Sequence, residues 1–267
     1  MAETSHTTLS QIAQPILTPP LLSVRMQHRQ GTLDIDVEFK LDQPWTILFG
    51  PSGSGKTTIL RAIAGLLLPD HGLIVSTGIP GSRRQNSITL LDTSADLFVP
   101  PHHRGIRLAA QQPNPFPHMT VFENLAYGMQ SSFETKLSAE KAVREVMESF
   151  GLTHLSASRP NRLSGGELQR LNLARAVAAS DSRMLLLDEP FTGMDAARRD
   201  QLLPCLEHKL ARRALPVLSV THDVAEAFQL GAEVIKLTDG RVVDQGPVER
   251  VLLPERKRLL NQLNSAD

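Results

Sequence analysis

Three short, continuous apolar runs lie far apart along the chain, and each ends in residues of a different kind. Residues 46–49 lead into a glycine-rich stretch, residues 184–187 into an acidic pair, and residues 217–220 into Thr-His-Asp. Apolar runs without polar alternation are typical of strands that are buried on both faces. Because helical segments lie between the runs, the pattern predicts an α/β fold with a mainly parallel sheet. In such a sheet, ligands bind at the carboxyl ends of the strands.

Helical periodicity is clearest directly after the first run. Ile59, Leu60, Ile63 and Leu67 recur at helical spacing within residues 56–68, so a helix is predicted there. Strand, glycine-rich loop and helix thus follow one another without interruption. A phosphate-binding loop needs this local order.

From about residue 112 to 180 the pattern is mainly helical and predicts an inserted α-helical subdomain. Thr120 and Glu123 can form a capping box, so a helix should begin there. A second helix is expected to be capped by Ser138 and to stop at Gly151.

Residues 72–101 are polar and rich in turn residues, and they predict an antiparallel β subdomain beside the parallel sheet. The apolar residues expected in its strands are Ile74, Val75, Ile88, Leu90 and Leu91.

The glycine-rich stretch matches the complete phosphate-loop pattern G-x-x-x-x-G-K-[ST]. It reads Gly50-Pro51-Ser52-Gly53-Ser54-Gly55-Lys56-Thr57. The glycines let backbone N–H groups face phosphates, and the following helix start adds partial positive charge. Lys56 is the point charge for the β- and γ-phosphates, and Thr57 offers a hydroxyl to Mg²⁺. The alternative is a glycine-rich turn that binds nothing, which the flanking strand and helix disfavour.

Polar residues at the ends of the other two runs are candidates for the chemistry. Asp188 is placed as a direct or indirect acidic partner of the metal, and Glu189 as the base that orients and deprotonates the attacking water. His222 could bond the γ-phosphate or hold that water through a ring nitrogen. The alternatives are a solvated acidic turn before Pro190 and a structural histidine.

Another predicted helix opens with Leu163-Ser164-Gly165-Gly166-Glu167. A serine hydroxyl and two unhindered glycine N–H groups at a helix N-terminus form an anion site. An ordinary serine N-cap is the alternative, although it does not explain the two glycines.

Composition and charge narrow the function classes. The 267 residues include 28 basic and 28 acidic side chains, so no global field favours nucleic acid or an anionic membrane. The single cysteine, Cys205, cannot form an intrachain disulfide, which fits a reducing compartment. Residues 1–20 lack the features of a signal peptide and are interpreted as a loose N-terminal extension. No apolar stretch approaches the roughly 20 residues of a membrane helix.

Taken in order, the phosphate loop, a glutamine before the helical subdomain, LSGG, LLLDEP and a strand ending in THD resemble the ATPase subunits of ABC transporters. The resemblance implies one ABC ATPase domain over residues 21–250. It implies a P-loop NTPase fold with a RecA-like core, an antiparallel β subdomain and an inserted α-helical subdomain. It also implies that two such domains enclose two ATP molecules, each held by the phosphate loop of one and the Ser164 region of the other.

The resemblance implies roles for individual residues. Thr57, Asp188 and Gln111 would hold Mg²⁺, and Gln111 is preferred over Gln112 by counting back from the sequence that follows. Glu189 resembles the catalytic base and His222 the switch histidine, while Gln111 would join metal and water to the helical subdomain. The residues implied to bind nucleotide are Gly50, Pro51, Ser52, Gly53, Ser54, Gly55, Lys56, Thr57 and Thr58 of one domain, with Ser164, Gly165 and Gly166 of the other.

The sequence departs from the family pattern in three places. Glu167 stands where the family usually has Gln. Residues 192–195 are the counterpart of the D-loop, with Asp195 as its aspartate, but the preceding residues differ from the usual Ser-Ala-Leu. No aromatic residue occurs where the family has an adenine-stacking ring, and His28 or Arg29 could stack there instead.

The absence of a membrane segment fits importers, in which ATPase and permease are separate chains. Residues 97–106 and 116–118 resemble importers of oxyanions and sugars, and residues 31–34 and 90–92 resemble the ATPases of molybdate importers. We therefore expect ATP hydrolysis that powers import of an oxyanion such as molybdate. Import of sulfate, a sugar, a polyamine or iron is the alternative, as is a soluble ABC ATPase without a transport role.

Expected partners are a second ATPase subunit, in a homodimer or a pair, membrane permease subunits and, indirectly, a solute-binding protein outside the membrane. Nucleic acid is not expected. The chain is expected to lie peripherally at the cytoplasmic face of the membrane. Residues 251–267 are expected to form a short tail without a regulatory β domain.

Overall fold

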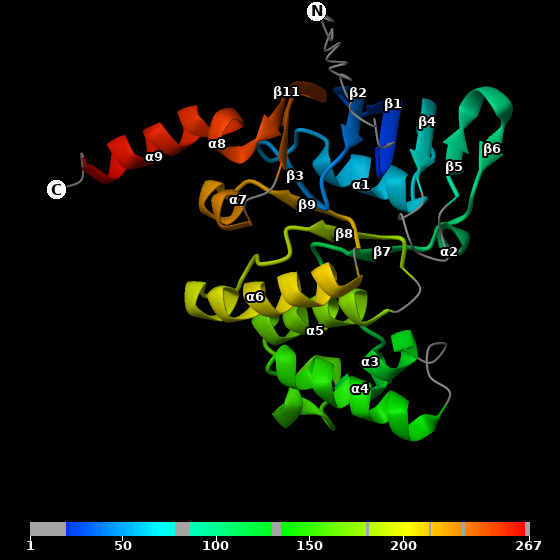
Figure 1. Cartoon of the computed structure of the whole chain (residues 1–267), viewed down its shortest axis with the longest axis vertical. Helices are drawn as coiled ribbons and strands as arrows, with labels where there is room; N and C mark the ends of the chain where they lie inside the picture. Colours follow the sequence, from blue (N-terminus) through cyan, green and yellow to red (C-terminus); the bar gives the residue numbers. More distant parts are fainter. Residues whose placement is uncertain are drawn as a thin grey trace, which may run out of the picture.

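A six-stranded, mainly parallel sheet crosses the centre of the molecule (Figure 1). The computed structural model describes residues 20–77, 86–129, 135–179, 182–213, 215–230 and 233–264. The strand order is β11-β10-β3-β9-β8-β7, and all neighbours are parallel except β10 and β11. The strands are β3 (Trp45–Phe49), β7 (Ile106–Ala109), β8 (Met184–Asp188), β9 (Val217–Thr221), β10 (Glu233–Thr238) and β11 (Arg241–Pro247). The predicted parallel sheet is confirmed.

Both faces of this sheet are covered. Ile47, Leu185 and Leu187 pack into a core cluster with the helices of one side. The intervening Leu48 and Leu186 belong to a second cluster on the opposite side. Every residue of β8 and β9 is consequently buried, which explains why the apolar runs show no polar alternation.

Helix α1 (Lys56–Ala64) follows the glycine-rich loop and packs between the two sheets. Its Ile59, Leu60 and Ile63 are completely buried. The helix ends at Ala64 rather than at residue 68 as predicted, because Gly65 adopts a left-handed φ of 80° and donates its N–H back to the carbonyl of Ala62.

An antiparallel five-stranded sheet with the order β2-β1-β4-β5-β6 covers the other side of α1 (Figure 1). It consists of β1 (Leu22–Gln30), β2 (Leu33–Leu41), β4 (His71–Ser76), β5 (Ile88–Asp92) and β6 (Leu97–Phe98). The antiparallel strands predicted from residues 72–101 are confirmed as β4, β5 and β6. The β1–β2 hairpin was not predicted. Short helices η1 (Thr93–Ala95) and α2 (Pro101–Arg104) lead back to the central sheet.

The predicted helical insertion consists of α3 (Val121–Met129), α4 (Lys136–Ser149) and α5 (Gly165–Ala178), with short turns η3 (Thr153–Leu155) and η4 (Pro160–Arg162). In Figure 1, α5 and α6 (Ala196–Arg213) lie below the central sheet, and α3 and α4 lie farther from it. Residues 130–134 of this region and residues 180–181 at its end lie outside the described residues. Helices therefore form most of the described part of this segment, as its pattern predicted.

Two helix starts were predicted from capping residues, with different outcomes. The Thr120–Glu123 capping box is confirmed: Glu123 N donates to Thr120 Oγ1 at 3.2 Å, and Thr120 N donates to Glu123 Oε2 at 2.7 Å. Ser138 was the wrong cap for α4. Thr135 caps it instead, since its Oγ1 accepts from Ser138 N at 3.2 Å and the helix already begins at Lys136.

The chain ends in α7 (Val224–Leu230), α8 (Val248–Val251) and α9 (Leu253–Asn264). Helix α9 leads away from the sheets toward the C-terminus (Figure 1), within the segment expected to be a tail. Among the described residues, no helix combines the length and apolar character that crossing a membrane requires. Residues 1–19 of the expected N-terminal extension lie outside the described part.

Arg104 at the end of α2 holds the C-terminal end of α1. The side chain is 1% exposed. Its Nη1 donates to the carbonyls of Ala62 and Ile63 at 2.8 Å each, and its Nε donates to Val99 O at 2.7 Å. The guanidinium thus donates to two carbonyls at the negative end of the helix dipole, of which Ala62 O also accepts from Gly65 N.

We predict that Arg104→Ala lowers the free energy of unfolding by about 3 kcal/mol, because buried carbonyls lose their donor and a cavity forms. Urea unfolding followed by circular dichroism measures this loss. Arg107→Ala, an exposed arginine on β7, is the control and should change the value by less than about 0.5 kcal/mol. Equal effects of the two substitutions would contradict the anchoring role of Arg104.

Candidate active site

The loop between β3 and α1 has the backbone shape that its glycines predict. Gly53 and Gly55 adopt left-handed φ angles of 82° and 99°, which residues with a Cβ atom rarely adopt. Gly50 has another reason to be glycine, since a Cβ there would lie 2.3 Å from the carbonyl oxygen of Leu237. The loop conformation is therefore set by both backbone geometry and close packing against β10.

Lys56 lies inside this loop and is 5% exposed. Its Nζ donates to the carbonyls of Gly50 and Pro51 at 2.7 Å each. Burial lowers the pKa of Lys56, and the nearby carboxylates of Glu189 and Asp188 oppose that change. The ammonium group thus has carbonyl and carboxylate groups around it in a part of the site that water reaches poorly.

Thr57 and Asp188, which were assigned to one metal from the sequence, lie within hydrogen-bond distance of each other beside the loop. Thr57 Oγ1 donates to Asp188 Oδ1 at 3.2 Å. Asp188 ends β8 and is 4% exposed; burial raises its pKa, and the bond from Thr57 opposes the rise. A hydroxyl and a carboxylate are the oxygen donors that Mg²⁺ prefers.

The backbone of Glu189 is unusual. Its φ of 47° is left-handed, a conformation rare for a residue other than glycine, asparagine or aspartate. Three hydrogen bonds hold the backbone of Glu189 in this conformation. Glu189 N donates to Val220 O at 3.0 Å, and Glu189 O accepts from Thr192 N at 3.2 Å and from Gln169 Nε2 at 3.3 Å. Neighbouring strand β9, the following turn and helix α5 thus fix the direction of this side chain.

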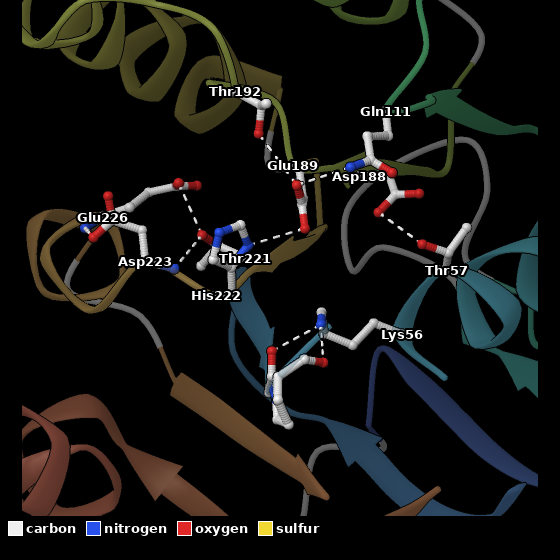
Figure 2. Close-up of polar contacts among 12 residues, drawn as sticks. Lys56, Thr57, Gln111, Asp188, Glu189, Thr192, Thr221, His222, Asp223 and Glu226 are labelled. Atoms are coloured by element: carbon white, nitrogen blue, oxygen red, sulfur yellow. Dashed lines mark hydrogen bonds and ion pairs between the residues drawn. The ribbon is translucent and has the colours of Figure 1, made fainter. Parts of the chain in front are cut away.

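Three side chains converge on the Glu189 carboxylate (Figure 2). Gln111 Nε2 donates to Oε2 at 3.0 Å, and Thr192 Oγ1 donates to the same oxygen at 3.2 Å. His222 Nδ1 lies 3.0 Å from Oε1. Gln111, Glu189 and His222, which the sequence singled out separately, are therefore brought together at the ends of β7, β8 and β9. Thr192 was not predicted to touch this carboxylate.

A cavity of about 420 Å³ opens over the loop. Its lining contains Gln111 but not Gln112, which lines a separate groove against the helical insertion. The lining residues are Gln30, Leu33, Ser52, Gly53, Gly55, Lys56, Thr57, Thr58, Gln111 and Glu189.

Gln30 and Leu33 of this cavity were missed from the sequence. They flank the turn of the β1–β2 hairpin, and Gln30 Oε1 accepts a hydrogen bond from Thr58 Oγ1. The expected stacking residues, His28 and Arg29, line a different surface cavity with Asp70. The period-two alternation of residues 22–30 and 33–41 would have placed this hairpin, but it does not reveal which end faces the loop.

Ser164 caps α5, and the departure at Glu167 completes the cap. Ser164 N donates to Glu167 Oε2 at 2.8 Å, and Glu167 N donates to Ser164 Oγ at 3.4 Å. A Cβ at Gly165 would meet no atom within 4 Å, and one at Gly166 would lie 3.5 Å from Gly193 O. Packing within the chain therefore does not require either glycine. None of these three signature residues, Ser164, Gly165 and Gly166, lines the cavity over the phosphate loop.

The residues present fit a phosphate group and a magnesium ion. The Ser54 hydroxyl is buried in the loop and has no hydrogen-bond partner among the described residues, so it is available to an anion. No group of three or more His, Cys, Asp or Glu side chains suited to a metal occurs in the part of the chain that the structure describes. A cation here would need oxygens from its ligand and water in addition to Thr57 and Asp188, as Mg²⁺ at phosphates does.

The fold and the phosphate loop define a P-loop NTPase. Residues 34–192, more than half of the chain, match the family described as "ABC transporter". The chain belongs to the ABC transporter family. The predicted P-loop fold and the resemblance to ABC ATPase subunits are thereby confirmed.

Two curated relatives are similar over most of this chain. The molybdenum import ATP-binding protein ModC of Mesorhizobium japonicum is 39% identical over 89% of the chain, and the chain spans 63% of that relative's length. The molybdate/tungstate import ATP-binding protein WtpC of Archaeoglobus fulgidus is 36% identical over 86% of the chain, which spans 88% of its length.

A solved structure of an ATP-binding cassette, a dimer in a post-hydrolysis state with ADP and Pi bound, aligns with a TM-score of 0.68 and 26% identity. The alignment covers 85% of this chain and 98% of that one. The arrangement of sheets and helices described above is therefore that of an ATP-binding cassette.

Burial of Glu226 on α7 predicts a pH-dependent stability. The side chain is 5% exposed, and burial raises its pKa to about 7 from an ordinary 4.5. The folded state therefore holds a proton that the unfolded state releases between about pH 4.5 and pH 7. Stability should fall as pH rises through that interval and level off above it, by on the order of 3 kcal/mol in total.

Glu226→Gln should remove this part of the pH dependence, because an amide does not titrate. Urea unfolding at several pH values from 4.5 to 8 measures it. Glu249→Gln, an exposed glutamate on α8, is the control and should leave the wild-type slope in place. A wild-type slope retained in Glu226→Gln would show that other groups cause it.

Proposed function

We propose that this chain hydrolyses ATP to power the import of molybdate or a closely similar oxyanion through a separate membrane permease. The observation that carries the proposal is the Glu189 carboxylate, which lies beside the phosphate loop within 3.0 Å of both Gln111 and His222. The names of the two relatives, which describe import of molybdenum and of molybdate or tungstate, favour this cargo over sulfate, sugars, polyamines and iron.

ATP would be held chiefly by its phosphates. Backbone N–H groups of the loop and the α1 N-terminus bind anionic oxygens, and Lys56 exchanges its carbonyl partners for the β- and γ-phosphates. The hairpin residues Gln30 and Leu33 then lie at the same cavity, where they would contact the remainder of the nucleotide. No ring stacking by His28 or Arg29 is proposed, because both lie in a different cavity.

Hydrolysis requires a water held in line with the γ-phosphate and a base to accept its proton. Glu189 is the proposed base, and its constrained backbone keeps the carboxylate at the carboxyl edge of the sheet. Gln111 contacts one carboxylate oxygen of Glu189 and His222 contacts the other, and both side chains would bind the water and the γ-phosphate as ATP enters. Thr57, Asp188 and Gln111 would hold Mg²⁺, which when bound neutralises phosphate charge.

The signature residues are proposed to serve a second copy of the chain or a paired ATPase subunit. Ser164 is exposed, and neither Gly165 nor Gly166 is needed for packing within the chain. Small residues at an exposed helix N-terminus allow a phosphate from outside the chain to approach the backbone closely. The dimeric state of the solved cassette with ADP and Pi supports this arrangement.

The permease is proposed to dock in the groove between the central sheet and the helical insertion. Tyr127 and Leu66 line this groove and are 55% and 52% exposed, and exposed apolar side chains that gather in one groove are typical of contact surfaces. Gln112 lines the same groove directly after Gln111, so a bound partner would lie next to the nucleotide site. The chain would then lie at the cytoplasmic face of the membrane, with a solute-binding protein acting on the permease from the other side.

We predict that Glu189→Gln slows ATP hydrolysis by about 10²- to 10⁴-fold, because the amide cannot accept the proton of the attacking water. ATP binding should persist, since the phosphate loop is unchanged, and the variant should accumulate as an ATP-bound dimer. Phosphate release and size-exclusion chromatography with ATP measure the two effects. Unchanged turnover would remove Glu189 from the role of base.

Glu207→Gln on α6, an exposed glutamate, is the matched control and should hydrolyse ATP as the wild type does. Uptake of radioactive molybdate by cells that lack the gene tests the cargo. Wild type and Glu207→Gln should restore uptake, and Glu189→Gln should not. Restoration of sulfate uptake but not molybdate uptake would overturn the proposed cargo and leave the ATPase assignment intact.

We predict that Ser164→Arg abolishes hydrolysis without weakening ATP binding to the isolated chain, because the bulky cation blocks the approach of the other subunit's nucleotide. Fluorescence titration with an ATP analogue under monomeric conditions measures binding, and phosphate release measures hydrolysis. Ser138→Arg, at a partly exposed position on α4, controls for the added charge. A loss of monomer affinity in Ser164→Arg would contradict a role toward a second subunit.

A further inference from the structure

Two buried hydrogen bonds stabilise the turn that carries His222. Glu226 Oε2 accepts from Thr221 Oγ1 at 2.9 Å, and Thr221 Oγ1 accepts from Asp223 N at 3.0 Å. Thr221 and Glu226 are 2% and 5% exposed. Figure 2 shows these side chains grouped beside the histidine. These hydrogen bonds thus join the residues before and after His222 to the first turn of α7.

His222 has little else to hold it. Its side chain is 54% exposed, and among the described residues the ring makes one hydrogen-bond contact, between Nδ1 and Glu189 Oε1 at 3.0 Å. An exposed ring with a single polar contact is oriented by the backbone on which it stands. The position of Nδ1 therefore depends on the conformation of residues 221–223.

The same turn is tied to α6 through Asp223. Asp223 Oδ1 accepts from Ala225 N at 2.7 Å and caps α7, while Arg199 Nη1 lies 3.6 Å from Asp223 Oδ2. The turn is therefore held on its buried side by Thr221, which donates to Glu226, and on its exposed side by Asp223, which caps α7 and lies near Arg199.

The charges that face Glu226 belong to three elements. Asp223 lies before α7, Arg199 lies on α6, and Glu189 lies after β8. Two of the three are acidic, and Glu226 Oε1 has no hydrogen-bond partner among the described residues. Burial and these carboxylates both raise the pKa of Glu226 and so favour its protonated, neutral form. The neutral carboxyl group can still accept the hydrogen bond from Thr221.

We propose that Glu226 is a positioning residue for His222: by accepting the Thr221 hydroxyl, it fixes the turn that sets His222 Nδ1 against the Glu189 carboxylate. The inference rests on the proposed ATPase function, because it concerns the same site. Glu226 touches neither Glu189 nor the nucleotide cavity in any contact that the structure records. Its effect on hydrolysis passes through His222.

Three substitutions, Glu226→Leu, Thr221→Val and Glu226→Gln, separate this role from a general loss of stability. Glu226→Leu removes the hydrogen-bond acceptor, and Thr221→Val removes the donor with little change in shape. Each should lower kcat for ATP about 10- to 100-fold, the scale expected when a catalytic group is displaced by about 1 Å. Affinity for ATP should change less than twofold, because the phosphate loop is intact.

Glu226→Gln should retain kcat within about threefold, since its amide oxygen can still accept the Thr221 hydroxyl. Glu255→Gln, which removes a partly buried acid from its ion pair with Lys236 between α9 and β10, is the control for loss of a structural carboxylate. It should leave kcat unchanged. Wild-type kcat in folded Glu226→Leu and Thr221→Val would overturn the proposal, as would equal losses in Glu226→Gln and Glu226→Leu.

The ¹⁵N chemical shift of His222 Nδ1 gives a readout that does not require activity. Glu189→Ala defines its value without the carboxylate contact. In Glu226→Leu and Thr221→Val the resonance should move to that value, and in Glu226→Gln it should stay at the wild-type value. If the wild type fails to hydrolyse ATP, the proposed function falls, while these shifts still test the positioning of His222. A wild-type shift in all three variants would overturn the inference.

Discussion

The burial of both faces of the central sheet is the constraint from which the active site follows. With helices packed against each side, the buried strands β3, β8 and β9 carry mainly apolar side chains along their length, and their charged groups lie at or just beyond the carboxyl ends. The carboxyl ends of β3, β8 and β9 lie at one edge because the strands are parallel. The phosphate loop, the acidic pair and His222 are therefore neighbours in space although they are far apart in sequence.

Sequence reasoning succeeded where one local cause determines the structure. The parallel strands, the phosphate loop and the Thr120 capping box each follow from a few adjacent residues, and the structure contains all three. Asp188, Glu189 and His222 were singled out because each lies at the end of a buried run, and the structure brings the three to one edge of the sheet. The end of α1 was misplaced because Leu67 continues the apolar spacing, and only the left-handed Gly65 shows that the helix has stopped.

The features that were missed depend on contacts between distant segments. Thr192 is an unremarkable residue in sequence and reaches Glu189 because the turn after β8 folds back. Gln30 and Leu33 belong to a hairpin whose alternation predicts strands but not the loop against which they pack. Glu226 resembles any acidic residue of a short helix, and its proposed role depends on its burial beside the turn that holds His222. Periodicity and motif spacing carry no information on such contacts.

Helix α5 connects two parts of the proposed mechanism. Ser164, which caps its N-terminus, is exposed, and Gln169 farther along the helix donates to the carbonyl of the strained Glu189. In the proposed dimer, a nucleotide bound at the start of α5 in one subunit belongs to the other subunit's phosphate loop. Any shift of α5 on that binding is transmitted through Gln169 to the base that acts on the first subunit's own nucleotide. The two hydrolytic centres are then energetically coupled, and by reciprocity each senses the occupancy of the other.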